Sequence, residues 1–125
     1  MQGELLSREI TPGSVLMALR GRLGEVNGGR AQDIVREITG RDDEALRRKF
    51  RETVEHLRRE GHPICSTTDA GYWWAASPED LDRACRFLVD RAMTSLSQVA
   101  AMKRVALPDL YGQLGLEIDR ADETP

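Results

Sequence analysis

A helix-breaking stretch near the middle of the chain limits the fold more than any other feature. Gly61-His62-Pro63-Ile64 follows a charged segment whose apolar residues recur every three or four positions. Glycine favours the left-handed conformation that ends a helix, and proline cannot continue one. Directly afterwards, Ile64–Thr68 is rich in β-branched residues, Asp69–Gly71 is a turn sequence, and Tyr72–Ala75 is aromatic. The sequence therefore predicts a helix that ends near Glu60 and a β-hairpin that follows at once.

Three helices are predicted before this hairpin. The first covers 15–22 with Ser14 as its N-cap, and the second covers 31–39 with Gly40 at its end. The third covers 43–60 and is capped by an aspartate at position 42 or 43. Each helix carries an apolar stripe, so the three can bury one common core. The stripes are Leu16, Leu19 and Leu23 in the first helix, Ala31, Ile34, Val35 and Ile38 in the second, and Leu46, Phe50, Val54 and Leu57 in the third.

A long fourth helix is predicted after the hairpin. Ser77 is a good N-cap, Pro78 suits the first helical position, and Asp80 is placed for an approximate capping box. The helix is expected to run to Val105, before Pro108, which makes it roughly 40 Å long. Its apolar residues alternate by threes and fours, as in a heptad pattern. This stripe consists of Leu81, Cys85, Leu88, Ala92, Ser95 or Leu96, Val99 and Met102.

The long helix can be used in two ways. It can fold back as a fourth helix of the core, or it can pair with the same helix of a second copy. Because it is longer than so small a core needs, we expect a homodimer. The expected dimer interface consists of Leu81, Leu88, Ala92, Leu96, Val99 and Met102.

The chain is long enough for one compact domain with an appendage. We expect a flexible N-terminal arm over 1–13, a helix-and-hairpin domain over 14–76, the long helix over 77–105 and an acidic tail over 106–125. The two cysteines do not form a disulfide framework. No apolar run could span a membrane, and the N-terminus lacks the pattern of a secretory signal. These features predict a cytoplasmic protein.

The charge balance gives mixed indications about nucleic acid. The net charge of −3 and the pI near 5.4 are a mild argument against nucleic-acid binding. However, residues 1–62 hold twelve Lys and Arg against eleven Asp and Glu, whereas residues 63–125 hold six against ten. The cations concentrate in Leu46–Arg51, which has four and no anion. This segment of the third helix is therefore the main candidate for contact with an anionic partner.

The order helix, loop, helix, turn, helix and hairpin is that of a winged helix-turn-helix domain. Leu57–Ile64 followed by Gly71–Trp74 resembles the corresponding block of winged helices of the biotin-repressor type. More widely, 23–104 resembles small winged-helix proteins encoded by phages and prophages. The segments that match are Gly24–Asn27, Ala31–Ile38, 57–74, Ser77–Leu81, and Arg91–Met93 with Leu96.

The resemblance implies a mainly α fold with a small β-hairpin and a role in binding duplex DNA. It implies a transcriptional regulator or a replication accessory protein, without catalysis. This chain departs from the biotin-repressor pattern in one respect. Between Ile38 and Leu57 it has roughly one helical turn more. Which arginines lead into the DNA groove is therefore left open.

The third helix supplies the principal candidate DNA contacts. Arg47, Arg48 and Arg51 are expected at base edges or phosphates, because arginine pairs bidentately with guanine. Lys49 lies among them. The alternative is an ordinary solvated helix, stabilised by glutamate–arginine pairs four residues apart. Those pairs are Glu44–Arg48, Arg48–Glu52, Arg51–Glu55 and Glu55–Arg59.

Further DNA contacts are expected outside the third helix. Arg30 lies at the start of the second helix, where free N–H groups suit a phosphate, and Arg41 lies in the following turn. Thr67 and Thr68 lie near the hairpin tip. No Lys or Arg occurs in 60–82, so the hairpin is poorly charged for binding the DNA backbone.

The hairpin tryptophans are expected to have different roles. Strand alternation places Tyr72 and Trp74 on one face and Trp73 on the other. Pairing with Ile64 favours Tyr72 and Trp74 as core residues and leaves Trp73 partly exposed. Trp73 is then available to pack on the long helix, to support a dimer contact or to stack at DNA.

The remaining chemistry-bearing residues do not form a recognisable site. His56, His62, Cys65 and Cys85 lack the spacing of a zinc site, so no metal is expected. No phosphate-binding loop, carboxylate pair or activated nucleophile is evident, so we expect neither catalysis nor a cofactor, small-molecule ligand or membrane partner. Two hypotheses follow. One is a homodimeric winged-helix protein that binds duplex DNA. The other is a winged-helix adaptor without DNA binding, which holds a protein partner through its hairpin tryptophan and long helix.

Overall fold

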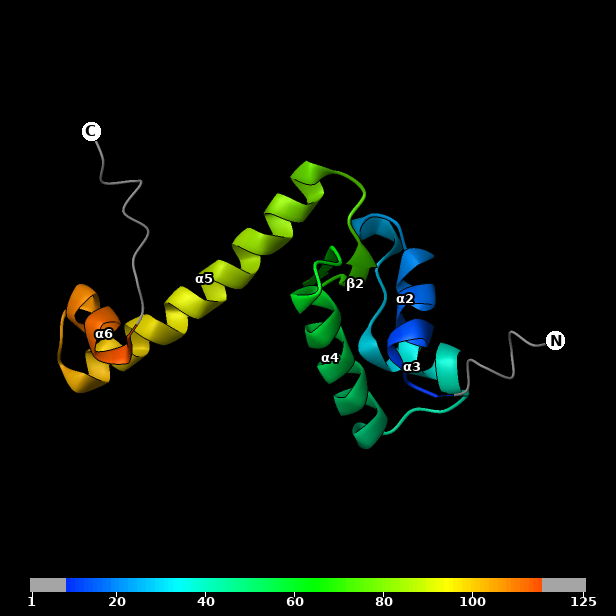
Figure 1. Ribbon diagram of the computed structural model, residues 1–125, viewed down its shortest axis with the longest axis horizontal. Coiled ribbons are helices and arrows are strands. Elements are labelled where there is room, and N and C mark those ends of the chain that lie inside the picture. Colours follow the sequence, from blue (N-terminus) through cyan, green and yellow to red (C-terminus); the bar gives the residue numbers. More distant parts are fainter. Residues whose placement is uncertain (1–8, 116–125) are drawn as a thin grey trace. The chain divides into compact units, whose positions relative to one another are not determined.

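The computed structural model describes residues 9–115, which are mainly helical with one two-stranded antiparallel sheet. This agrees with the expected α+β class. The chain divides into two compact units, one ending at Arg86 and the other beginning at Phe87. No helix of the described residues is long and apolar enough to cross a membrane. The elements in Figure 1 are α2 (Pro12–Arg20), η1 (Glu25–Asn27), α3 (Ala31–Thr39), α4 (Glu44–Arg59), β1 (Ile64–Thr67), β2 (Gly71–Trp74), α5 (Pro78–Lys103) and α6 (Leu107–Leu114).

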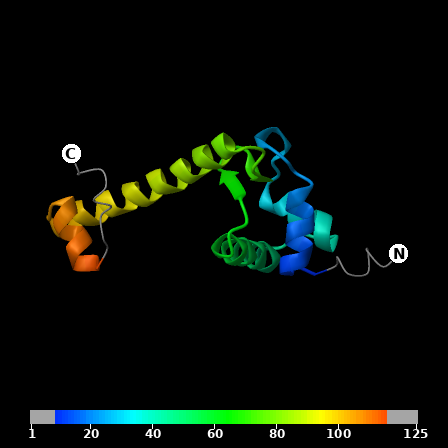
Figure 2. The ribbon, with the colours of Figure 1, turned by 45° about the horizontal axis from the view of Figure 1, so that its top comes forward.

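Three helices and the hairpin bury the main core of the first unit. The helices α2, α3 and α4 pack against one another, and β2 contacts α2 (Figure 2). Each helix buries the face on which its apolar residues recur at helical spacing, as the sequence predicted. The buried residues of this core are Ile10, Val15, Leu19, Ile34, Val35, Ile38, Phe50, Val54, Leu57 and Ile64.

The first helix begins earlier than expected, because Thr11 rather than Ser14 is its N-cap. The Thr11 side chain accepts the Ser14 N–H at 3.0 Å, and Ser14 Oγ accepts the Thr11 N–H at 3.0 Å. This reciprocal capping box lets Pro12 take the first helical position. The prediction of a helix over 15–22 is therefore displaced, and Leu23 is exposed rather than part of the stripe.

The residues just before α2 belong to the core. Ile10 is 2% exposed, and the Glu9 carbonyl accepts the Ser14 hydroxyl at 2.7 Å. The predicted flexible arm over 1–13 is therefore wrong for residues 9–13, because apolar burial and the capping box hold them. Residues 1–8 lie outside the described part.

The second and third helices confirm the predicted boundaries. Gly40 ends α3 with a φ of 86°, in the left-handed region where glycine is favoured. Asp43 caps α4 by accepting the Leu46 N–H at 2.9 Å. In α4, Phe50 and the apolar residues that follow it are fully buried, whereas Leu46 is partly buried at the edge of the core.

The hairpin is extended by the loop between α2 and α3. In β1–β2, Ile64 pairs with Trp74 and Thr67 with Gly71. Gly29 and Tyr72 exchange two backbone hydrogen bonds, at 3.0 and 2.7 Å. Gly71 has a φ of +82°, and a side chain there would collide with the Gly29 carbonyl. Glycine at position 71 is therefore required by both conformation and space.

Trp73, not Tyr72 or Trp74, is the fully buried aromatic residue of the hairpin. Strand alternation divides the three as predicted, and Tyr72 and Trp74 pack partly buried against the main core. Trp73 is 2% exposed in a second cluster with Cys65 and Ala84. The expectation that Trp73 is partly exposed is wrong, because the first turns of α5 cover that face of the hairpin. Packing on the long helix, one of the three roles considered for Trp73, is confirmed.

The start of α5 is tied to this second cluster through Asp80. Ser77 Oγ accepts the Asp80 N–H at 3.1 Å, as expected for an N-cap. The Asp80 carboxylate does not close the box on Ser77, but accepts the Ala76 N–H and the Trp73 Nε1–H, both at 2.9 Å. One carboxylate therefore joins the helix start to the hairpin.

The second unit contains a short helix, α6, in a segment that was expected to be a tail. α5 ends at Lys103, and Arg104 follows with a φ of 59°. Leu107–Leu114 form the two-turn helix α6, whose Tyr111 hydroxyl donates to Met93 Sδ at 3.3 Å. The predicted acidic tail over 106–125 is therefore wrong for 107–114, and residues 116–125 lie outside the described part.

Candidate nucleic-acid interface

The N-terminal half of α4 presents the cations that the sequence singled out. Arg48 and Lys49 are exposed, and neither makes an ion pair with another residue of 9–115. Both lie away from the face that carries Phe50 and Val54, because successive residues are 100° apart around the helix. These two side chains are available to an external anion.

Arg47 has a different role, because it is held by two carboxylates. Its Nη1 lies 2.6 Å from Asp42 Oδ2, and its Nη2 lies 2.9 Å from Glu44 Oε1. The hydrogen bond from Arg47 lowers the pKa of Glu44, and the two carboxylates raise the pKa of Arg47. Asp42 lies in the turn before α4, so Arg47 fixes that turn. We therefore assign it to positioning α4 rather than to contacting a ligand.

Arg51 is intermediate between Arg47, which pairs with two carboxylates, and Arg48, which pairs with none in residues 9–115. Its Nη2 is 3.3 Å from Glu44 Oε2, and its side chain is nearly half exposed. Among the four predicted pairs at four-residue spacing, Glu55–Arg59 is present at 3.9 Å. The described ion pairs do not include the other three, and Glu44 pairs with Arg47 and Arg51 instead. The solvated-helix alternative therefore describes the C-terminal half of α4 better than its N-terminal half.

Two further cations flank α3. Arg30 is the N-cap residue of α3, is exposed, and makes no side-chain capping bond. Arg41, in the turn before α4, is exposed and lies 3.7 Å from Asp43 Oδ2. An exposed ion pair of this length is weak, so the Arg41 side chain can exchange its partner.

The hairpin tip offers hydroxyl groups but no cation. Thr67 Oγ1 accepts the Ala70 N–H at 3.0 Å and is thereby committed to the turn, whereas Thr68 is exposed. Trp73 was a candidate contact, but its burial and its hydrogen bond to Asp80 remove it from any surface. The proposed stacking of Trp73 on DNA is therefore wrong.

Two arginines near the hairpin were missed by the sequence interpretation. Arg58 donates from Nε to the Ile64 carbonyl at 2.8 Å and from Nη2 to Ser66 Oγ at 3.0 Å, which ties α4 to β1. Burial lowers the pKa of Arg58. Arg20 lies over the Trp74 ring, 5.4 Å from its centroid. The repeated arginine before Gly61 was the available signal, but it does not distinguish a structural arginine from an exposed one.

The predicted dimer interface is partly occupied within the chain. Leu81 packs against the cluster of Trp73, so it is not available to a second copy. Leu96 and Val99 are partly buried. The other three, Leu88, Ala92 and Met102, are exposed, Met102 to 81%.

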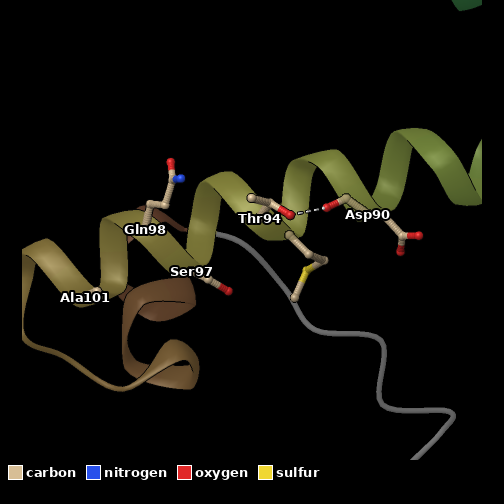
Figure 3. A pocket seen from close by; sticks show the side chains of 6 residues that line it. Asp90, Thr94, Ser97, Gln98 and Ala101 are labelled. Atoms are coloured by element: carbon tan, nitrogen blue, oxygen red, sulfur yellow. Dashed lines mark hydrogen bonds between the residues drawn. The ribbon is translucent and has the colours of Figure 1, made fainter. Parts of the chain in front are cut away.

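The other chemistry-bearing features of residues 9–115 include a hollow on α5 and two free thiols. A hollow of about 550 Å³ lies along α5, lined by residues of that helix alone (Figure 3). Its single carboxylate is Asp90, and the Thr94 hydroxyl donates to the Asp90 main-chain carbonyl at 3.0 Å. Over residues 9–115, no group of three His, Cys, Asp or Glu side chains could hold a metal ion. In the same range Cys65 is buried and Cys85 is exposed, both as free thiols.

Comparison with protein-family models, with curated proteins and with solved structures found no match to this chain.

Proposed function

We propose that this protein binds duplex DNA as a winged helix-turn-helix domain, with α4 as its recognition helix. The observation that carries the proposal is the pair of exposed cations Arg48 and Lys49 on the N-terminal half of α4, neither of which makes an ion pair within residues 9–115. In helix-turn-helix proteins, base contacts come from the N-terminal residues of the recognition helix. The N-terminal half of α4 has the charge and the exposure that this role requires.

The contacts can be divided by chemistry. Arg48 is suited to bidentate contact with guanine O6 and N7, and Lys49 and Arg51 are suited to phosphates. Arg30 lies where the first N–H groups of α3 also favour a phosphate. The pairing of Arg47 with Asp42 and Glu44 keeps the start of α4 in place while these contacts form.

The hairpin contributes little charge to this interface. For each bound chain, three cations are assigned to phosphates, namely Arg30, Lys49 and Arg51. They predict that the logarithm of the affinity falls with the logarithm of the salt concentration with a slope of about −3. The acidic net charge predicts weak binding to random DNA at physiological salt. Both expectations fit a regulator or replication accessory protein of phage type that recognises specific sites.

Fluorescence anisotropy with mixed duplex DNA at two salt concentrations tests the proposal. The variant Arg48→Ala/Lys49→Ala is expected to weaken binding roughly tenfold or more. It should reduce the salt slope by about one per bound chain, because only Lys49 of the two is assigned to a phosphate. Arg59→Ala is the matched control, since Arg59 is exposed on the C-terminal half of the same helix and lies 3.9 Å from Glu55. It should change the affinity less than about threefold. Equal losses in the two variants would contradict an interface at the start of α4.

A second candidate is an adaptor that binds a protein. The hairpin tip without cations favours it, although burial of Trp73 removes the residue expected to hold the partner. Absence of DNA binding even at low salt would select this alternative.

We also propose that the protein acts as a homodimer through α5. The exposed apolar residues Leu88 and Met102 support this. A dimer mass in light scattering at tens of micromolar is the expected result, and a monomer mass would exclude the homodimer.

A further inference from the structure

The apolar stripe of α5 is covered at its start and mostly exposed afterwards, with Val99 partly buried. Leu81, the first member of the stripe, packs on the Trp73 cluster. Leu88 and Met102, at later heptad positions, are 40% and 81% exposed. Cys85, between Leu81 and Leu88, is also exposed. Alternation by four and three residues continues through the whole stripe, which is the pattern that packs helix against helix.

One flank of this stripe has a distinctive order of side chains. Asp82, Val89, Leu96 and Lys103 follow one another at intervals of seven and therefore share a flank. Neither Asp82 nor Lys103 makes an ion pair with another residue of 9–115. Val89 is 57% exposed. The flank thus has opposite charges at its two ends and apolar residues between them.

The opposite flank carries Arg91 and Gln98. The Arg91 guanidinium lies over the Phe87 ring, 5.6 Å from the ring centroid. The Phe87 contact holds the Arg91 charge by a cation–π interaction. Neither Arg91 nor Gln98 is acidic, so this flank has no group that attracts a cation from a second copy.

The charges distinguish the two directions in which a second α5 could pair. In a parallel pair each flank meets the opposite flank of the partner, so Arg91 would lie beside the partner's Leu96. Asp82 would then have no cation. In an antiparallel pair each flank lies against the same flank of the partner helix. Asp82 then lies beside the partner's Lys103, and Val89 lies beside the partner's Leu96. Twofold symmetry forms each of these pairs twice.

We infer that a second copy of this chain pairs with α5 in the antiparallel direction, with the twofold axis between Ala92 and Ser95. The inference rests on the proposed homodimer and adds its geometry. Leu88 then packs against the partner's Val99, and Cys85 packs against the partner's Met102. The small residues at 92 and 95 meet at the centre, where the helices approach most closely.

Cysteine crosslinking tests the direction, because Cys85 is exposed and Cys65 is buried. Under mild oxidation Met102→Cys should form a disulfide-linked dimer between Cys85 and the new cysteine of the partner. The unmodified chain should not, because antiparallel pairing separates its two Cys85 residues by roughly 26 Å along the helix. Met102→Cys/Cys85→Ser is the control and should lose the link. A Cys85–Cys85 link in the unmodified chain would overturn the inference, as would a Met102→Cys dimer that forms no link.

A charge exchange provides an independent test. Asp82→Lys or Lys103→Asp alone should weaken the dimer roughly fivefold or more, measured by sedimentation equilibrium, and the double variant should restore the affinity. Failure of the double variant to recover would overturn the antiparallel pairing. A monomer mass for the unmodified chain would overturn the dimer and its direction together. DNA binding through α4 is decided separately by the anisotropy titration.

Discussion

Replacing Trp73 by Phe removes the hydrogen bond that joins the hairpin to the start of α5. The Trp73 indole donates to Asp80 Oδ2 at 2.9 Å, and Asp80 is 5% exposed. A hydrogen bond to a charged group contributes about 1.5–3 kcal/mol. Asp80 keeps the Ala76 N–H and one contact at 3.2 Å from Arg83, so its charge is not left without a partner. Adding the smaller ring volume, we expect a loss of about 2–4 kcal/mol in the free energy of unfolding.

Urea denaturation followed by circular dichroism measures this loss as a lower midpoint with an unchanged slope. Asp80→Ala and the double variant complete a double-mutant cycle, in which a coupling of about 1–2 kcal/mol is expected between Trp73 and Asp80. Trp74→Phe is the control. Trp74 is only partly buried, so this change should cost less. A coupling below about 0.3 kcal/mol would refute the assigned role of the Asp80 carboxylate.

Four further predictions concern a glycine, an arginine and the two cysteines. Gly71→Ala should lower stability by about 2 kcal/mol or more in thermal melts, whereas Gly112→Ala, with open space around it, should be neutral or stabilising. Arg47→Gln should return the pKa of Glu44 towards its ordinary value in an NMR titration, and an unchanged Glu44 would contradict the pairing. Burial raises the pKa of Cys65 to about 11, so at pH 8 a thiol reagent should modify Cys85 alone. Since the unfolded chain releases this proton near pH 9, stability should fall as the pH rises from 9 to 11, and a flat profile would contradict the burial.

Local sequence signals predicted the parts of the fold that local chemistry decides. Gly40 ends α3 and Asp43 caps α4, because the conformation of a glycine and the reach of an aspartate act over a few residues. The N-cap of α2 was assigned to Ser14 instead of Thr11, because local chemistry alone allows either residue. Thr11 and Ser14 are both good capping residues in one reciprocal box, and the sequence does not say which begins the helix.

The burial of Trp73 could not be predicted from the hairpin alone. Strand alternation separates Trp73 from Trp74 but does not state which face will be covered. The answer depends on the path of α5, whose Ala84 closes over Trp73. Likewise, helical periodicity indicated that Arg48 and Arg51 lie on the exposed face of α4, but the pairing of Arg47 with Asp42 depends on a turn that brings residues five apart together. The candidate DNA contacts were therefore sorted by tertiary geometry, not by the run of charge.

Because Trp73 is hydrogen-bonded to Asp80, its intrinsic fluorescence reports on the junction between the hairpin and α5. Indole emission shifts to longer wavelength when the ring becomes exposed to solvent. Trp73 is buried beside the capped start of α5, so unfolding of that turn should expose it. Trp74, partly exposed beside Arg20, provides a second signal that does not depend on this turn. In the variant Trp74→Phe, the remaining fluorescence should report on the start of α5 alone. Any ligand or partner that loosens or tightens that helix could then be detected without a label.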